Sequence, residues 1–175
     1  MHVERQGAEA TGREARRLAA LAGYAMLDTA PEAELDDITR LAARICGTPV
    51  SLITLVDDVR QFFKARSGYA GAENAPLDSG FCPLVVNAGA PLIIPDASSD
   101  PAYVGNPATR DAGVRFYAGV PLLTSDDLVL GTLRAGEPYE VRSNEARTAG
   151  DEYAHRLRSL RRAHNSRGEA SNLGR

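Results

Sequence analysis

The chain of 175 residues contains 20 basic and 23 acidic residues, and its formal net charge of −3 argues against general nucleic-acid binding. Hydrophobic residues form 43% of the sequence, which is enough for one domain with its own core. The sequence shows neither a signal peptide nor an apolar run near the roughly 20 residues that span a bilayer. We therefore expect one cytoplasmic domain that binds neither nucleic acid nor membrane.

The N-terminal part of the chain predicts an arm and two helices. Residues 1–12 are polar, so we expect a flexible arm, and residues 13–26 predict the first helix. The second helix has Thr29 as its predicted cap, Glu32 as the partner in a capping box, and Gly47 as its end. Its predicted buried face, at helical spacing, consists of Leu35, Ile38, Leu41, Ala42 and Ile45.

The middle of the chain predicts mainly strands. Residues 49–58 are rich in β-branched side chains, and residues 60–69 return as their hairpin partner. The next elements are a loop (70–79), a short helix (80–89), a strand (91–97) and an irregular connection (98–113). Connections longer than about 12–15 residues are often functional, so we expect this last one to cover a pocket.

Residues 114–133 predict a second hairpin that turns at residues 125–127. One face of its first strand is apolar and is predicted to be buried: Phe116, Ala118, Val120 and Leu122. The opposite face carries Arg115, Tyr117, Gly119 and Pro121, which are too small or too polar for a second core. We therefore expect that second face to form the floor of a pocket.

The C-terminal part predicts one more helix, over residues 143–164, before a disordered tail over 165–175. Its apolar residues recur at steps of three and four in a narrow stripe, which is typical of a partner seam. We expect a homodimer built on the first and last helices. The stripe includes Ala149, Tyr153, Leu157 and Leu160.

An antiparallel sheet with helices on one face satisfies this order of elements. We therefore predict an α+β fold, with one domain over residues 13–164, terminal helices on one face of the sheet and a ligand pocket on the other.

A series of short motifs, in this order, resembles the GAF family of sensory domains. The resemblance spans residues 13–133. The motifs are LDTAPE (27–32), PVSLITLVD (49–57), QFFKARSG (61–68), FC (81–82), PDA (95–97), DPAY (100–103), RFYAGVPL (115–122) and LGTL (130–133).

The resemblance implies an antiparallel sheet with a ligand pocket, and a role as a sensory input. Relatives usually precede histidine kinases, nucleotide cyclases or cyclic-di-GMP enzymes, so a histidine kinase or cyclic-di-GMP enzyme is an expected partner in trans. One departure stands out: relatives usually continue Gly-Thr-Leu-Cys-Val-Ile-Asp, whereas residues 131–137 read GTLRAGE. We therefore expect the last strand to be shortened or rerouted.

The predicted ligand-binding residues come from the short helix, the long connection and the second hairpin. Gly119 would let a ligand approach the backbone, and Arg115 and Tyr117 would orient it. A salt bridge from Arg115 to Asp96 or Asp111 is an equal alternative. The full set is Phe81, Cys82, Asp96, Tyr103, Asn106, Arg115, Tyr117, Gly119 and Pro121.

Catalytic and metal chemistry find little support in the sequence. His2, His155 and His164 all fall outside the predicted pocket, which argues against a His-ligated haem, a His-rich metal site or a catalytic triad there. Cys82 could be a reactive thiol, but a small buried residue is the favoured interpretation, and Cys46 belongs to the core. A metal site of Asp96, Asp100 and Cys82 is weaker than turn and cap roles for the aspartates. No cofactor can be named.

Three functional hypotheses follow. The first is a non-catalytic sensory module that binds a small molecule or a protein partner and relays the change through its terminal helices. The second is a redox sensor or enzyme that acts through Cys82. The third is a structural dimerisation or adaptor module with a vestigial pocket.

Overall fold

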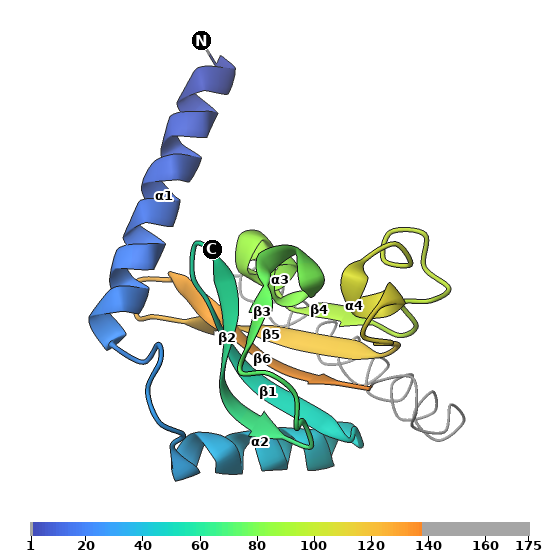
Figure 1. Ribbon diagram of the computed structural model, residues 1–175. Coiled ribbons are helices and arrows are strands. Elements are labelled where there is room, and N and C mark those ends of the chain that lie inside the picture. Colours follow the sequence, from blue (N-terminus) through green and yellow to red (C-terminus); the bar gives the residue numbers. More distant parts are fainter. Residues whose placement is uncertain (1, 138–175) are drawn as a thin grey trace, which may run out of the picture.

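The computed structural model describes residues 2–137, and its centre is a six-stranded antiparallel sheet in the order β3-β2-β1-β6-β5-β4 (Figure 1). This arrangement confirms the predicted α+β class. The strands are β1 (Val50–Val56), β2 (Arg60–Ser67), β3 (Asn74–Pro76), β4 (Leu92–Ile94), β5 (Tyr117–Leu123) and β6 (Val129–Gly136).

Helices lie on both sides of this sheet (Figure 1). Helix α2 covers one face, and the short helices α3 and α4 lie over the other, while α1 projects away from the sheet. None of the helices within residues 2–137 is long and apolar enough to cross a membrane. The helices are α1 (His2–Tyr24), α2 (Ala33–Cys46), α3 (Cys82–Ala88) and α4 (Pro107–Arg110), with a 3-10 turn η1 at Leu77–Ser79.

Strand β1 is the middle of the fold because both of its faces are buried. All seven of its residues are buried, as expected for a β-branched strand with elements packed on both sides. It pairs with β2 on one edge and β6 on the other. Its alternating side chains divide the core into two parts, with Val56 in the cluster beneath α3 and Leu55 in the cluster against α1.

Two expectations for the N-terminal helices are wrong. Helix α1 begins at His2 rather than at residue 13, because Ala, Glu and Arg in this segment are strong helix formers. Helix α2 begins after Glu32, which makes no side-chain capping bond. The Thr29 hydroxyl instead donates a hydrogen bond to the Met26 carbonyl (2.8 Å). Gly47 ends the helix as predicted, with a φ of 63°.

The buried face of α2 also differs from the expected one. Thr39, Ala43 and Cys46 are buried, whereas Leu41 and Ile45 are exposed, at 58% and 65% of their surface. Small residues on the buried side let the helix lie close to the sheet, so its larger apolar residues turn outward. Ile38 is exposed as well.

Two segments expected to be irregular contain regular structure. Residues 70–79 hold β3 and η1, and residues 98–113 hold α4. Asn106 caps helix α4: its side-chain carbonyl accepts a hydrogen bond from the Ala108 N–H (2.8 Å), and Pro107 occupies the first helical position. The Asn-Pro pair is therefore a helix-start signal, although residues 98–113 were expected to be irregular.

The last strand is complete rather than shortened. Strand β6 keeps regular pairing with β1 from Leu55↔Gly131 to Val50↔Gly136, and it pairs with β5 along the same length. On β5, Phe116 precedes the strand and is buried with Ala118, but Val120 is 38% exposed because α2 lies mainly over β1 and β2. The predicted helix over 143–164, its stripe and the tail over 165–175 lie outside the described residues.

Candidate ligand cavity

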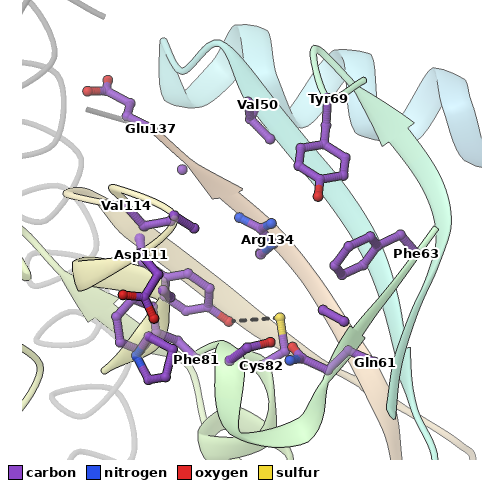
Figure 2. Close-up of a pocket in the computed structure, with 17 residues that line it drawn as sticks. Val50, Gln61, Phe63, Tyr69, Phe81, Cys82, Asp111, Val114, Arg134 and Glu137 are labelled. Atoms are coloured by element: carbon purple, nitrogen blue, oxygen red, sulfur yellow. Dashed lines mark hydrogen bonds between the residues drawn. The ribbon is translucent and has the colours of Figure 1, made fainter. Parts of the chain in front are cut away.

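A cavity of about 380 Å³ lies on the face of the sheet opposite α2 (Figure 2). Strands β1, β2, β5 and β6 form its floor, and β3, η1, the start of α3, and α4 with the loop after it form its walls. Its volume falls within the range of small-molecule sites. The lining residues are Val50, Gln61, Phe63, Tyr69, Ala75, Ser79, Phe81, Cys82, Pro107, Ala108, Asp111, Ala112, Val114, Tyr117, Arg134, Gly136 and Glu137.

Hydrogen bonds connect the walls of the cavity to its floor and to each other. The Gln61 amide on β2 donates to the Pro76 carbonyl at the end of β3 (2.7 Å). The Asn106 amide donates a longer bond to the Gly80 carbonyl (3.5 Å), which ties the start of α4 to the segment before α3. The cavity is therefore framed by contacts between distant parts of the chain.

Aromatic rings form much of the cavity wall. Phe81 makes edge contacts with Tyr117 (ring centroids 5.2 Å apart) and with Tyr103 (5.6 Å). On the other side, Phe63 meets Tyr69 edge-on at 5.5 Å. These rings give the cavity a mainly apolar lining suited to a flat or aliphatic body.

Tyr117 and Cys82 form a buried polar pair in the lining. The Tyr117 hydroxyl donates a hydrogen bond to the Cys82 Sγ (3.6 Å), and both residues are 1% exposed (Figure 2). Burial, followed by the neighbouring thiol, raises the pKa of Tyr117 well above its usual value of 10. The phenol therefore stays protonated and acts as a donor at neutral pH.

Three charged residues line the cavity. Asp111 is held by Arg110, whose Nε and Nη2 donate to its carboxylate at 2.7 and 2.8 Å. Burial raises the pKa of the Glu137 carboxyl above its usual value. Arg134 projects from β6 into the cavity, and it lies between Phe63 of β2 and Cys82 at the start of α3 (Figure 2). Within residues 11–137 its guanidinium makes no hydrogen bond or ion pair.

The structure brings together three of the predicted ligand-binding residues: Phe81, Cys82 and Tyr117 all line the cavity. The other six do not line it. Tyr103 packs behind Phe81, and Asn106 caps α4.

The remaining predicted residues have local contacts. Asp96 accepts hydrogen bonds from the Ser98 backbone and hydroxyl, in an Asx turn. Arg115 donates to the Thr109 carbonyl (3.1 Å), and Asp111, one of its two predicted partners, is paired with Arg110. Pro121 lies on β5 opposite Thr132, away from the cavity lining.

Gly119 has a different role from the predicted one. A Cβ at this position would stand 2.4 Å from the Tyr117 hydroxyl and 2.8 Å from its ring. The missing side chain therefore makes room for the Tyr117 ring, not for a ligand.

Sequence reasoning missed Arg134, Gln61, Phe63 and Tyr69 as lining residues. Alternation along β6 would have placed Arg134 on the same face as Gly136, had the strand been expected to continue. Within the described part of the chain, no three His, Cys, Asp or Glu side chains are grouped to hold a metal ion. Neither Cys46 nor Cys82 forms a disulfide bond.

Comparison with known proteins decides the family. The GAF domain family matches residues 30–157, which is most of the chain. The chain belongs to the GAF family. The resemblance read from the short motifs is thereby confirmed.

One curated relative of this GAF chain is a cyclic di-GMP phosphodiesterase of Pseudomonas aeruginosa, with 31% identity over 109 residues. That match covers 62% of this chain but only 18% of the relative. The shared part is therefore a small fraction of the larger protein.

Solved GAF structures share the fold. The GAF domain of an Acinetobacter phosphoenolpyruvate-protein phosphotransferase is 18% identical, with a TM-score of 0.50 over 79% of this chain and 84% of that one. The A. Aeolicus nlh2 GAF domain, in an inactive state, is 14% identical, with a TM-score of 0.51 over 86% of this chain and 92% of that one.

Proposed function

We propose that this GAF domain is a non-catalytic sensory module that binds a small molecule in the cavity and relays binding through its terminal helices. The observation that carries the proposal is the cavity itself, which has aromatic walls and a few convergent polar groups. The two cysteines, which form no disulfide bond, suit the reducing cytoplasm expected from the sequence.

A relay to α1 has a physical basis in Arg17. This buried residue of α1 donates to the Val56 carbonyl at the end of β1 (2.6 Å) and to the Val129 carbonyl at the start of β6 (3.5 Å). The same two strands carry Val50 and Arg134 in the cavity lining. A ligand that shifts either strand would therefore act on the anchor of α1.

The output of the module is a signalling protein in trans, either a histidine kinase or a cyclic-di-GMP enzyme. The similarity to part of a cyclic di-GMP phosphodiesterase supports the second. We also propose a homodimer through α1 and the predicted helix over 143–164. A monomer in sedimentation at high micromolar concentration would contradict the dimer, and Leu157→Glu should weaken a true dimer without unfolding the domain.

Native mass spectrometry and an absorbance spectrum of the purified full chain test the sensory proposal directly. A bound molecule, or stabilisation by members of a metabolite library, is the expected result. Ala75→Leu narrows the cavity wall and should reduce that binding, whereas Ala72→Leu, on an exposed loop position, should not. Unchanged binding in Ala75→Leu would move the ligand away from the cavity.

The redox alternative rests on Cys82, which lines the cavity but is 1% exposed. A thiol buried among apolar side chains is a poor nucleophile, because the reagent cannot reach it and its thiolate form is disfavoured. We expect slow modification of Cys82 by a thiol reagent at neutral pH. Rapid modification, lost in Cys82→Ser but kept in Cys46→Ser, would favour the redox function.

A further inference from the structure

Arg134 gives the cavity a positive charge that has no ion-pair partner among residues 11–137. It lies on β6 opposite Leu52 of β1 and Gly119 of β5, so its backbone is fixed on both sides in the middle of the sheet. Its own carbonyl accepts a hydrogen bond from the Ser51 hydroxyl (2.8 Å), which adds a third restraint. The guanidinium projects into the cavity from this rigid base (Figure 2).

Residue 136 leaves space for this side chain. A Cβ at Gly136 would stand 2.9 Å from the Phe116 carbonyl oxygen and 3.4 Å from Arg134 Nη1, so the bare backbone here fits against β5 and leaves room beside the guanidinium. Residues 134 and 136 are both part of the RAGE segment in which this chain departs from the Cys-Val-Ile-Asp continuation described above. The departure therefore supplies a cation together with the space that holds it.

The protein itself does not neutralise this cation among residues 11–137. The carboxylate of Asp111, at the cavity wall, accepts hydrogen bonds from Nε and Nη2 of Arg110. Glu137, the other acidic residue of the lining, forms no ion pair with Arg134. The nearby Tyr117 phenol is protonated, so it carries no negative charge.

A guanidinium that lies beside aromatic walls, without a charged partner in the described part of the chain, is suited to one class of ligand. Its planar donors match the two oxygens of a carboxylate, and partial removal from water strengthens that pairing. Phe63, Tyr69 and Phe81 offer an apolar surface to the rest of the molecule.

We propose that the cavity selects small organic acids, with the carboxylate held by Arg134 and an aromatic or aliphatic body against the rings. This proposal rests on the proposed sensory function and names the chemical class of its ligand.

Matched acids and amides test the proposal, because each pair differs in charge but hardly in shape. The probes are benzoate and benzamide, phenylacetate and phenylacetamide, and 3-phenylpropionate and 3-phenylpropanamide. Dissociation constants are measured by calorimetry on the full 175-residue chain. We expect at least one acid to bind at least tenfold more tightly than its amide, since a hydrogen bond to a charged group is worth about that factor.

Two variants assign the selectivity to Arg134. Arg134→Met should abolish the preference for the acid, and Arg134→Lys should retain part of it. Arg40→Met removes one positive charge from an exposed site on α2, where Arg40 pairs with Asp37, and should leave the preference intact.

The outcomes separate this proposal from the sensory function. Equal binding of acids and amides, unchanged in Arg134→Met, overturns the selection of anions while the cavity remains a binding site. If no acid binds but another molecule occupies the cavity, the anion proposal also fails alone. If nothing binds in the cavity by any of these measurements, both proposals fail.

Discussion

The two faces of the sheet differ in how their cationic side chains are paired. On the face covered by α2, the Lys64 ammonium donates to the Thr29 hydroxyl (2.5 Å) and the Ala30 carbonyl (2.8 Å), and it pairs with Glu32 (2.7 Å). On the cavity side, Arg134 has no such partner within residues 11–137. A cation with several protein partners holds the fold together, whereas one without them is available to a ligand.

The position of Lys64 explains why its partners matter. Pairing between β1 and β2 shifts register after Ile53↔Ala65, so that Lys64 has no partner residue on β1. Its side chain, none of which is exposed, reaches the segment between α1 and α2 instead. Lys64 therefore fixes that segment onto the sheet.

The largest expected effect comes from Lys64→Met. The change leaves the Ala30 carbonyl and Glu32 without their partner, and we expect a loss of about 3 kcal/mol in the free energy of unfolding. Urea denaturation measures this loss, provided that the dependence of the unfolding free energy on urea concentration is the same in both proteins. Arg134→Met is the matched control on the cavity side and should change stability by less than about 0.5 kcal/mol, because no partner in the described chain is lost. A larger loss of stability in Arg134→Met than in Lys64→Met would contradict the comparison.

Gly119→Val tests the packing of the cavity floor. The new side chain would collide with the Tyr117 ring, so we expect a loss of about 2 kcal/mol from overpacking. Thermal unfolding measures the change. In a Tyr117→Ala background the same substitution should have a much smaller effect, and an equal effect there would show that the collision is not the cause.

The fold could be predicted from the sequence more fully than the site. Motif order and the β-branched run at residues 49–58 were sufficient for the sheet, and alternation placed Tyr117 on the cavity side. Gln61 and Phe63 lie two residues apart on one face of β2 and both line the cavity, so alternation along this strand could have identified them had a pocket wall been expected there. Arg134 was missed for another reason: the departure at residues 134–137 was interpreted as the end of a strand. Its small residues, Ala135 and Gly136, in fact remain paired within the sheet.

Arg17→Met tests the anchor of α1 and hence the proposed relay. Arg17 is buried, and its Nη2 also pairs with Oε1 of Glu14 at 2.7 Å. The Glu14 side chain is about half exposed. We expect a loss of about 1 kcal/mol, together with faster hydrogen exchange in α1. Arg16→Met, at an exposed position in the same turn, is the control and should alter neither. Unchanged exchange in Arg17→Met would remove the physical basis of the relay.

The smallest effect at neutral pH belongs to Tyr117, and it should appear only in alkali. Burial raises the pKa of Tyr117 in the folded protein above its unfolded value of about 10. Below the unfolded value both states are protonated, so the stability from this group is complete. As the pH rises above about 10, the unfolded chain releases the proton first, and this group's contribution declines until the pH reaches the folded pKa.

Replacing Tyr117 by Phe isolates this contribution. Between the unfolded and the folded pKa of Tyr117, the wild type should lose up to about 1.4 kcal/mol of unfolding free energy per pH unit. Tyr117→Phe should show no such loss from this position, because Phe cannot ionise. The stability difference between wild type and Tyr117→Phe should therefore be constant from pH 7 to 9 and fall above pH 10. Denaturation midpoints across this range measure it, with Tyr24→Phe as the exposed control. A difference that stays constant above pH 10 would mean that water reaches the phenol, and the cavity floor would then be less enclosed than its packing against Cys82 and Phe81 indicates.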